Sequence, residues 1–271
     1  MPELPEVETT RRGILPHLLN KRVASVVVRQ KKLRWPITPA LQEDLPGQLI
    51  NSITRRGKYL LLASSDGTLI IHLGMSGSLR IVSQQQAAGK HDHVDIIFKN
   101  HKILRYTDPR RFGCLLWHRG DITTHPLLKA LGPEPLEEQF DGDHLATRSR
   151  KRSTSIKSFI MDSRNVVGVG NIYANEALFL AGISPKRAAG KISVERYRVL
   201  AQSIKQVLFS AIQMGGTTLR DFTDSNGEPG YFKQSLSVYS RGGLPCVTCQ
   251  ELLKEIRLGQ RSTVYCSNCQ R

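Results

Sequence analysis

Two pairs of cysteines near the C-terminal end constrain this chain more than any other feature. Both pairs have the spacing C-x-x-C, and sixteen residues separate them. The four residues are Cys246, Cys249, Cys266 and Cys269. Two such pairs can supply four thiolates to one tetrahedral zinc ion, and Gly259 lies between them, where it suits the turn of a short hairpin. The sequence therefore predicts a structural zinc ion on a β-hairpin.

Disulfide bonds are the alternative use for these cysteines. A disulfide framework is typical of secreted chains, but the first residues show no apolar leader segment. The fifth cysteine, Cys114, lies in the strand-like run FGCLLWH and is expected to be a small buried apolar residue. We therefore expect reduced thiols and a cytoplasmic protein.

The charge of the chain indicates a polyanionic partner. The 271 residues include 39 Lys and Arg against 23 Asp and Glu, a formal net charge of +16. No apolar run is long enough to span a membrane. Cations cluster in the zinc region and in the run RSRKRS at 148–153, with Lys157 close behind. Nucleic-acid phosphates are the expected partners, while an ordinary solvated surface is the alternative explanation of a basic run.

The first half of the chain has the pattern of β-strands. Six stretches are β-branched or alternate with period two: RVASVVVRQ, KYLLLASS, TLIIHL, HVDIIF, KILRYTD and FGCLLWH. Asp66-Gly67 and Asn100-His101 each separate two of these stretches at the distance of a tight hairpin. An antiparallel sandwich or barrel is the expected product.

Paired prolines at 131–136 end this pattern, and we place a domain boundary there. Beyond it the spacing is helical, most clearly in residues 193–212, where Ser193 can cap the helix. The apolar stripe of this helix comprises Tyr197, Leu200, Ile204, Val207, Leu208 and Ile212. A long polar stretch, GGTTLRDFTDSNGEPGYF, follows, and a loop of that length is usually functional or mobile.

The first six residues, MPELPE, offer a nucleophile if Met1 is removed. Pro2 would then carry a secondary α-amine, whose ordinary pKa near ~8 leaves a neutral fraction at physiological pH. Glu3 and Glu6 lie beside it, and Pro5 suits the first turn of a helix through VETTRRGILPHLL. The positive end of that helix would disfavour the ammonium form, and a close carboxylate could shuttle its proton. An ordinary acid-capped helix also explains the segment, and the segment alone favours that simpler interpretation.

The run VGVGNIYA at 167–174 precedes the helical segment NEALFLAG. Its glycines would let backbone amides approach an anion, and Asn171 could cap the helix so that its first N–H groups hold a phosphate. An ordinary glycine-rich turn between helices explains the run equally well.

The turn DPRRFG at 108–113 displays two cations beside an aromatic ring. An aromatic wedge with an adjacent arginine can intrude into a base stack and fill the gap left by a nucleotide that has rotated out. The ordinary alternative is that Phe112 belongs to the core and Arg111 to the solvated surface.

Several motifs occur together and in order: PELPEVE, RGKY, HLGMSGSLR, KHDHVD, YTDPRRFG, VGVGNIYANE, GGTT and the two C-x-x-C pairs. In these motifs the chain resembles bacterial formamidopyrimidine-DNA glycosylases over nearly its whole length. The related endonuclease-eight-type glycosylases typically begin with Pro-Glu-Gly-Pro-Glu and lack the full set of intruding residues. This chain has Leu4, Met75, Arg110 and Phe112. The resemblance therefore places it in the branch that acts on oxidised purines.

The resemblance implies an α+β fold in three parts. An N-terminal antiparallel β-sandwich with a catalytic N-terminal helix would occupy residues 1–130. A helix-two-turn-helix module with the lesion-recognition loop would occupy 131–235, and a zinc finger 236–271. Double-stranded DNA would bind in the cleft between the two lobes. One structural Zn²⁺ would be the cofactor, with no metal or redox cofactor in the chemistry.

The activity implied is that of a monomeric bacterial enzyme of base excision repair, associated with the nucleoid through DNA. It would flip out and remove 8-oxoguanine opposite cytosine, and formamidopyrimidines. Pro2 would attack C1′ of the damaged nucleotide and form a Schiff base, and β,δ-elimination would then leave a one-nucleotide gap. Glu3 would be the acid/base residue near the sugar, and Glu6 would hold the hydrogen bonding of the site together.

Two cations complete the implied chemistry. Lys58 would contact a phosphate beside the lesion and assist proton transfer, although from the residues alone it is an ordinary hairpin lysine. Arg261 would pin the phosphates that flank the flipped nucleotide and donate a proton in the second elimination, a role that suits the planar fork of arginine.

The remaining implied contacts hold the DNA. Met75, Arg110 and Phe112 would fill the void, with Arg110 favouring cytosine as the orphaned base. Backbone phosphates would be held by His91, Arg110, Lys151, Lys157 and Asn171. Arg150 and Arg152 are alternatives to Lys151 in that run. The loop that closes over the extruded base would read it at Thr217, Thr218 and Tyr231.

Two other functions stay as alternatives. A zinc-containing DNA-binding protein without catalysis explains the charge and the cysteines. It does not explain why Pro2, Glu3 and Glu6 coincide with Lys58 and the intruding residues. A glycosylase directed at oxidised pyrimidines is the nearer alternative, and a preference for thymine glycol over 8-oxoguanine would identify it.

Overall fold

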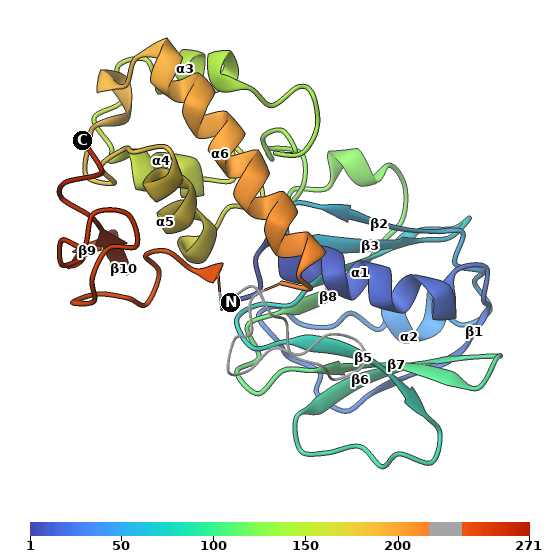
Figure 1. The fold of residues 1–271 in the computed structure, drawn as a ribbon. Coiled ribbons are helices and arrows are strands. Elements are labelled where there is room, and N and C mark those ends of the chain that lie inside the picture. The colour runs from blue at the N-terminus through green and yellow to red at the C-terminus, as the bar shows by residue number, and fades with distance from the viewer. Residues whose placement is uncertain (217–234) are drawn as a thin grey trace. The chain divides into compact units, whose positions relative to one another are not determined.

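The structure, a computed structural model, describes residues 1–216 and 235–271 (Figure 1). The chain forms two compact units. The first comprises Met1–Lys129 and a segment that begins at Met214, and the second comprises Ala130–Gln213 and the C-terminal residues. In the part of the chain that the structure describes, no helix is long and apolar enough to cross a membrane. The three predicted domains stay a prediction, because the second unit contains both the helices and the zinc region.

Two antiparallel sheets form the first unit. One has the strand order β1-β6-β7-β5 and the other β2-β3-β4-β8. The strands are β1 (Val23–Val28), β2 (Ser52–Arg56), β3 (Tyr59–Ala63), β4 (Thr68–His72), β5 (Ser78–Ser83), β6 (Asp92–Phe98), β7 (Lys102–Thr107) and β8 (Cys114–His118). Buried side chains from both sheets join one apolar cluster, which confirms the predicted antiparallel β-sandwich.

Both predicted hairpins of this unit are confirmed. Asp66-Gly67 lies in the turn between β3 and β4, whose register pairs Ala63 with Thr68. Asn100-His101 joins β6 to β7, and His101 has a φ of +64°, the left-handed conformation that such tight turns require. Cys114 is 1 % exposed, as expected of a small apolar core residue.

The helices of the first unit are α1 (Leu4–Leu18) and the short α2 (Ala40–Asp44). α1 packs against β2 and β3 of one sheet and against β5 of the other. Four of its apolar residues, Leu4, Val7, Ile14 and Leu18, are at most 1 % exposed, and their spacing of three, seven and four places them on one helical face. The start of the chain is therefore anchored to the core of the sandwich.

One carboxylate connects α1 to the β2–β3 turn. Glu8 accepts hydrogen bonds from Arg11 at 2.8 Å and Arg12 at 2.9 Å, and Arg55 on β2 approaches it at 3.3 Å. The same Arg55 guanidinium donates to the Gly57 carbonyl at 2.9 Å. Burial alone would raise the pKa of Glu8, but the hydrogen bonds from Arg11 and Arg12 and the charges of Arg11 and Arg55 outweigh it and lower the pKa to about 2.

Besides a short 3₁₀ helix at Ala189–Lys191, the second unit contains four α-helices and one hairpin within its described residues. They are α3 (Gly142–Ser149), α4 (Ile156–Met161), α5 (Asn171–Leu180), α6 (Val194–Gln213), β9 (Lys254–Leu258) and β10 (Arg261–Tyr265). α6 confirms the predicted long helix: Ser193 Oγ accepts from the Arg196 N–H at 3.4 Å, and all six residues of the predicted stripe are buried. Gly259 and Gln260, both with positive φ, form the tight turn of the predicted β9–β10 hairpin.

The predicted cap of α5 is wrong. The helix begins at Asn171 itself, and Gly170 is the N-cap, with φ −118° and ψ −156°. The Asn171 Oδ1 atom is buried and accepts no hydrogen bond among the described residues. A glycine therefore occupies the cap, and the asparagine side chain is not used to close the helix end.

We expect Glu8 to contribute to stability in a pH-dependent way. Its pKa is lowered in the folded protein, so its contribution is complete above the usual value of 4.5 and is lost as pH falls toward about 2. Glu8→Gln should therefore lower the free energy of unfolding at pH 7 by on the order of 1–3 kcal/mol. Urea denaturation at pH 7, 4.5 and 3 measures the difference, which should shrink as the pH falls. A difference independent of pH over this range would show that the charge of Glu8 is not what stabilises the turn.

Candidate reaction centre and nucleic-acid interface

Two glutamates form a capping box at the start of α1. Glu3 is the N-cap and accepts from the Glu6 backbone N–H, while the Glu3 N–H donates to Glu6 Oε2 at 2.8 Å. Glu3 is 2 % exposed and Glu6 is fully buried. Pro2 is also buried and directly precedes this turn. The structure thus brings Pro2, Glu3 and Glu6 together at the positive end of a helix, where the first backbone amides point toward any negative charge.

Gly216 lies against the carboxylate of Glu6. A Cβ built on Gly216 would come within 3.2 Å of Glu6 Oε1, and its φ of +83° is in the region that favours glycine. The sequence reasoning used this glycine only as part of the GGTT motif, because nothing local indicates contact with a residue so distant along the chain. The predicted lesion-reading residues Thr217, Thr218 and Tyr231 lie outside the described residues.

Lys58 lies in the β2–β3 turn that Arg55 holds. Its positive charge acts on the ring of His72, on β4. Burial lowers the pKa of His72 to about 4, and the positive charges of Lys58 and Arg34 act in the same direction. His72 Nδ1 accepts from the Gly74 N–H at 3.0 Å, so the neutral ring carries its proton on Nε2. The sequence reasoning missed His72, because one histidine in a strand gives no signal of its own.

The predicted void-filling residues lie on two loops that touch. Met75 is 37 % exposed and Phe112 is 45 % exposed, so both apolar side chains can reach a partner outside the unit. The Arg110 guanidinium lies over the Phe112 ring, 4.9 Å from its centroid. The Arg110 backbone N–H approaches the hydroxyl of Ser76 at 3.3 Å, and Ser76 directly follows Met75. His91, predicted to contact phosphate, is exposed in the same unit.

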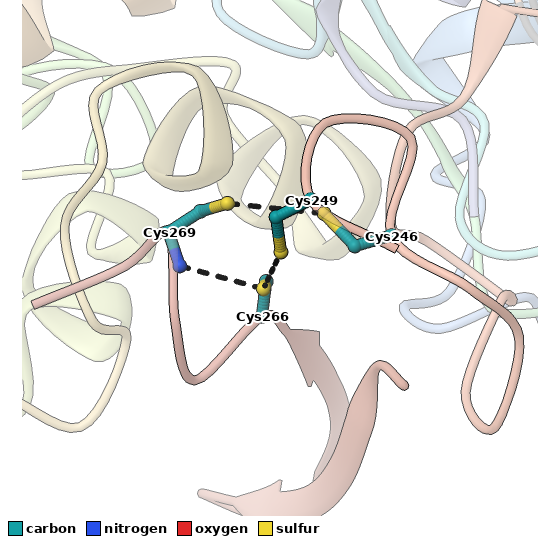
Figure 2. Close-up of side chains that lie close together, drawn as sticks. All are labelled: Cys246, Cys249, Cys266 and Cys269. Carbon is teal, nitrogen blue, oxygen red and sulfur yellow. Dashed lines mark hydrogen bonds between the residues drawn. The ribbon is translucent and has the colours of Figure 1, made fainter. Parts of the chain in front are cut away.

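The four predicted metal ligands converge at one point (Figure 2). Their sulfur atoms all lie within 4.8 Å of one another. The Sγ atoms of Cys246 and Cys269 are 3.9 Å apart, and those of Cys249 and Cys266 are 3.4 Å apart. A tetrahedral zinc ion with four thiolates requires sulfur separations of ~3.8 Å, so these side chains fit the ion. No other group of three or more metal-binding side chains is found in the described part of the chain.

Arg261 begins β10 and is exposed, and two buried side chains hold the strand that carries it. Lys157 on α4 is 1 % exposed, and its Nζ donates to the Ser262 carbonyl at 2.8 Å and to Thr263 Oγ1 at 2.7 Å. Asn175 on α5 accepts from a β10 backbone N–H at 3.0 Å. The ammonium of Lys157 is therefore bonded within the protein, and this geometry does not favour its predicted contact with a phosphate.

The other predicted phosphate contacts of the second unit are Lys151 and Asn171. Lys151 is exposed and has a φ of +59°. Arg150 and Arg152 are exposed as well, so the structure does not select one residue of this run. Asn171 is the first residue of α5, where the helix end attracts anions.

The chain is similar to known proteins along its whole length. Residues 1–115 match the family described as "Formamidopyrimidine-DNA glycosylase N-terminal domain", residues 131–223 the "Formamidopyrimidine-DNA glycosylase H2TH domain", and residues 243–271 the "Zinc finger found in FPG and IleRS". A protein of Methylococcus capsulatus named formamidopyrimidine-DNA glycosylase is 60 % identical over 271 residues, which is 100 % of both chains.

Two solved structures are similar in fold. The MutM (FPG) protein from Thermus thermophilus has a TM-score of 0.90 and 36 % identity, covering 99 % of this chain and 98 % of that one. A mutant Lactococcus lactis FPG protein in complex with Fapy-dG containing DNA has a TM-score of 0.93 and 33 % identity, covering 100 % of both chains. The zinc-finger match and the convergence of the four cysteines confirm the predicted zinc site.

We expect removal of the zinc ion to unfold the β9–β10 hairpin. Structural zinc contributes an apparent ~10–16 kcal/mol of binding free energy that is also folding free energy, more than a two-stranded hairpin can replace. Cys249→Ala should abolish stoichiometric zinc and remove the protection of backbone amides in residues 254–265. Metal analysis and hydrogen exchange measure the two effects. Cys114→Ala, which changes a buried cysteine of the first unit, should leave zinc content and hairpin protection unchanged. Full protection after verified loss of zinc would contradict the assignment.

Proposed function

The chain belongs to the formamidopyrimidine-DNA glycosylase family, and from that premise we propose how its own residues carry out the reaction. The protein is a DNA glycosylase and abasic-site lyase of base excision repair, and its partner is double-stranded DNA that contains oxidised purines. Its site of action in our proposal is the bacterial cytoplasm, on the DNA of the nucleoid.

Pro2 is the nucleophile once Met1 has been removed. Its nitrogen lone pair forms a bond to C1′ of the damaged nucleotide while the bond from C1′ to the oxidised base breaks, and the base leaves with a proton. Glu3 takes the proton from the Pro2 nitrogen and gives it to the ring oxygen O4′ as the C1′–O4′ bond breaks, and the ring-opened adduct becomes a positively charged Schiff base. Glu6 keeps Glu3 in place through the hydrogen bond to its backbone N–H, which is 2.8 Å long.

Two eliminations follow from the Schiff base, whose positive nitrogen accepts electrons. Loss of a C2′ proton breaks the bond to the 3′ phosphate, and Lys58 assists the proton transfer. A second elimination breaks the bond to the 5′ phosphate, with Arg261 as the proton donor. A gap of one nucleotide with phosphate at both ends results.

The observation that carries this proposal is the buried turn at the start of α1. An α-amine at Pro2 would stand at the positive end of a helix and next to two buried glutamates. The helix end disfavours the ammonium form, and a neighbouring carboxylate can accept its proton. Capping of the helix alone would explain the two glutamates, but it would not explain a buried proline that becomes the first residue when Met1 is removed.

The lesion and its partner base are recognised by separate parts of the chain. Met75, Arg110 and Phe112 fill the space left by the flipped nucleotide, and Arg110 contacts the orphaned cytosine. His91, Lys151 and Asn171 hold backbone phosphates. Excision opposite cytosine restores the original base pair, whereas excision opposite adenine would fix a mutation.

Borohydride trapping tests the nucleophile. The protein, with Met1 removal verified by mass spectrometry, is incubated with an 8-oxoguanine:cytosine duplex and borohydride, and the crosslink should map to Pro2. Pro2→Gly should lower strand cleavage by on the order of a hundredfold or more while duplex affinity is kept. Any fraction that retains Met1 should be inactive, because its Pro2 nitrogen is an amide.

Pro5→Ala is the matched control, because Pro5 occupies the same buried turn and should leave the crosslink at Pro2. A crosslink that maps to a lysine would keep the lyase reaction and reject Pro2 as nucleophile. Faster excision of thymine glycol than of 8-oxoguanine would move the protein to the pyrimidine branch.

Lys157→Met tests whether the buried ammonium acts by holding the strand of Arg261. Methionine has a side chain of similar length but cannot bond to Ser262 and Thr263, so we expect the second elimination to slow relative to the first. The ratio of the two cleavage products on a denaturing gel measures this. The salt dependence of duplex binding should not change, whereas loss of a direct phosphate contact would lower the slope by about one. Lys151→Met, at an exposed lysine, should change the slope and not the product ratio.

A further inference from the structure

A buried aspartate lies behind the two loops that carry the void-filling residues. Asp108 is fully buried, and its carboxylate accepts hydrogen bonds from Ser76 Oγ at 2.8 Å and from Tyr106 OH at 3.0 Å. The Gly113 backbone N–H donates to the same carboxylate at 2.9 Å. Ser76 directly follows Met75, and Gly113 directly follows Phe112. The carboxylate is therefore bonded next to each of the two exposed apolar side chains.

Asp108 also bonds to the backbone of Arg110 and His91, the two residues of these loops that are predicted to contact phosphate. The Arg110 N–H approaches Asp108 Oδ1 at 3.3 Å. The Asp108 backbone N–H donates to the His91 carbonyl at 3.0 Å, and the Asp108 carbonyl bonds to His93 Nε2 at 2.8 Å. Asp108 is thus bonded to, or next to, each residue of the first unit that is predicted to bind DNA outside the reaction centre. These residues are Met75, His91, Arg110 and Phe112.

Glycines let the two loops meet backbone to backbone. A Cβ on Gly74 would collide with the backbone of Phe112 and Gly113, and a Cβ on Gly113 would collide with the Tyr106 hydroxyl and the His72 carbonyl. Gly74 has a φ of +67°, which also favours glycine. Neither loop can shift without displacing the other, so the bonds to Asp108 fix both loops in one relative position.

The donors to this carboxylate are hydroxyl and amide groups, and each bond has a direction. A buried acceptor that is satisfied by several directional donors specifies one geometry, because any displaced donor would be left without a partner away from water. An ion pair would tolerate more movement. This arrangement suits a pair of loops that must hold the side chains of Met75, Arg110 and Phe112 in fixed positions while they enter a base stack.

We propose that Asp108 is a positioning residue that sets the relative placement of Met75, Arg110 and Phe112, and through them the preference for the base opposite the lesion. Asp108 touches neither substrate nor reacting atoms in this proposal. The proposal rests on the proposed function, because the opposite-base preference has meaning only for a lesion-excising enzyme.

Asp108→Asn tests the proposal. The substitution keeps the shape of the side chain but replaces one carboxylate oxygen, an acceptor, by an NH₂ group that would face the donors of its neighbours. Single-turnover excision is measured on duplexes with 8-oxoguanine opposite cytosine and opposite adenine. The rate opposite cytosine divided by the rate opposite adenine should fall by roughly tenfold, since a buried hydrogen-bonded group is left without its partner. Ser76→Ala removes one of the bonds and is the milder second variant, with a smaller fall in the ratio, if Asp108→Asn does not fold.

Asp95→Asn is the matched control. Asp95 is a carboxylate of the same unit, 2 % exposed, and it bonds to Arg105 at 2.9 Å and to Arg29 at 2.7 Å. Its loss should lower the melting temperature and leave the ratio unchanged. A purely structural role for Asp108 would give the same result as this control.

A second measurement tests the positioning role of Asp108 separately from excision. The fluorescence of 2-aminopurine placed opposite a stable abasic-site analogue reports intrusion without any chemistry, and it should change less on binding of Asp108→Asn than of the parent protein. An unchanged rate ratio together with an unchanged fluorescence response in the folded variant would overturn the role of Asp108. Absence of excision by the parent protein would instead overturn the proposed function, and the fluorescence would still test the positioning.

Discussion

The capping box of α1 is the constraint on which the rest of the proposed reaction centre depends. Glu3 and Glu6 close the helix end with their carboxylates, so two groups that the proposed chemistry uses are also required by the backbone. The helix cannot tilt, because Val7, Ile14 and Leu18 are fixed in the core of the sandwich. The amine that we propose as the nucleophile directly precedes this turn and is therefore held by a rigid element, as precise chemistry requires.

The charged residues of this chain divide by burial into two kinds. Exposed cations such as Arg261 and Lys151 contribute to the net charge of +16 and are available to phosphates. Buried polar groups bond instead to the segments that carry exposed residues. Lys157 bonds to the strand that begins at Arg261, and Asp108 bonds to the loops of Met75 and Phe112. Glu8 bonds to Arg55, which in turn bonds to the turn that carries Lys58. A long exposed side chain gains little from a single ion pair, so its position has to come from the backbone beneath it. The buried groups provide that position.

The sequence predicted most of the fold where the pattern is local. The zinc hairpin, the two tight hairpins and α6 follow from spacing and turn residues within a few positions. β2 and β5 were missed, because the burial of Ser52–Arg56 and Ser78–Ser83 does not alternate and their polar residues weaken the pattern. The direction of Lys157 could not be predicted, since its partners on β10 are more than a hundred residues away. The same holds for Asp108 and Ser76, whose bond joins residues that are 32 apart.

Arg261 illustrates why this protein combines a metal site with buried polar contacts. The apolar core of the zinc region is small, consisting of Val238, Cys246, Leu253, Val264 and Cys266 with a few half-buried neighbours. Two strands with so little apolar burial are not stable by themselves, so the zinc ion must supply the missing folding energy. The metal holds the ends of the hairpin far from its turn, however, and leaves the turn free to tilt. Lys157 bonds to β10 at Ser262 and Thr263, next to Arg261, and Asn175 bonds to the same strand at Val264. The position of Arg261 therefore requires two supports. The zinc ion keeps the hairpin folded, and the bonds from α4 and α5 fix the orientation of β10.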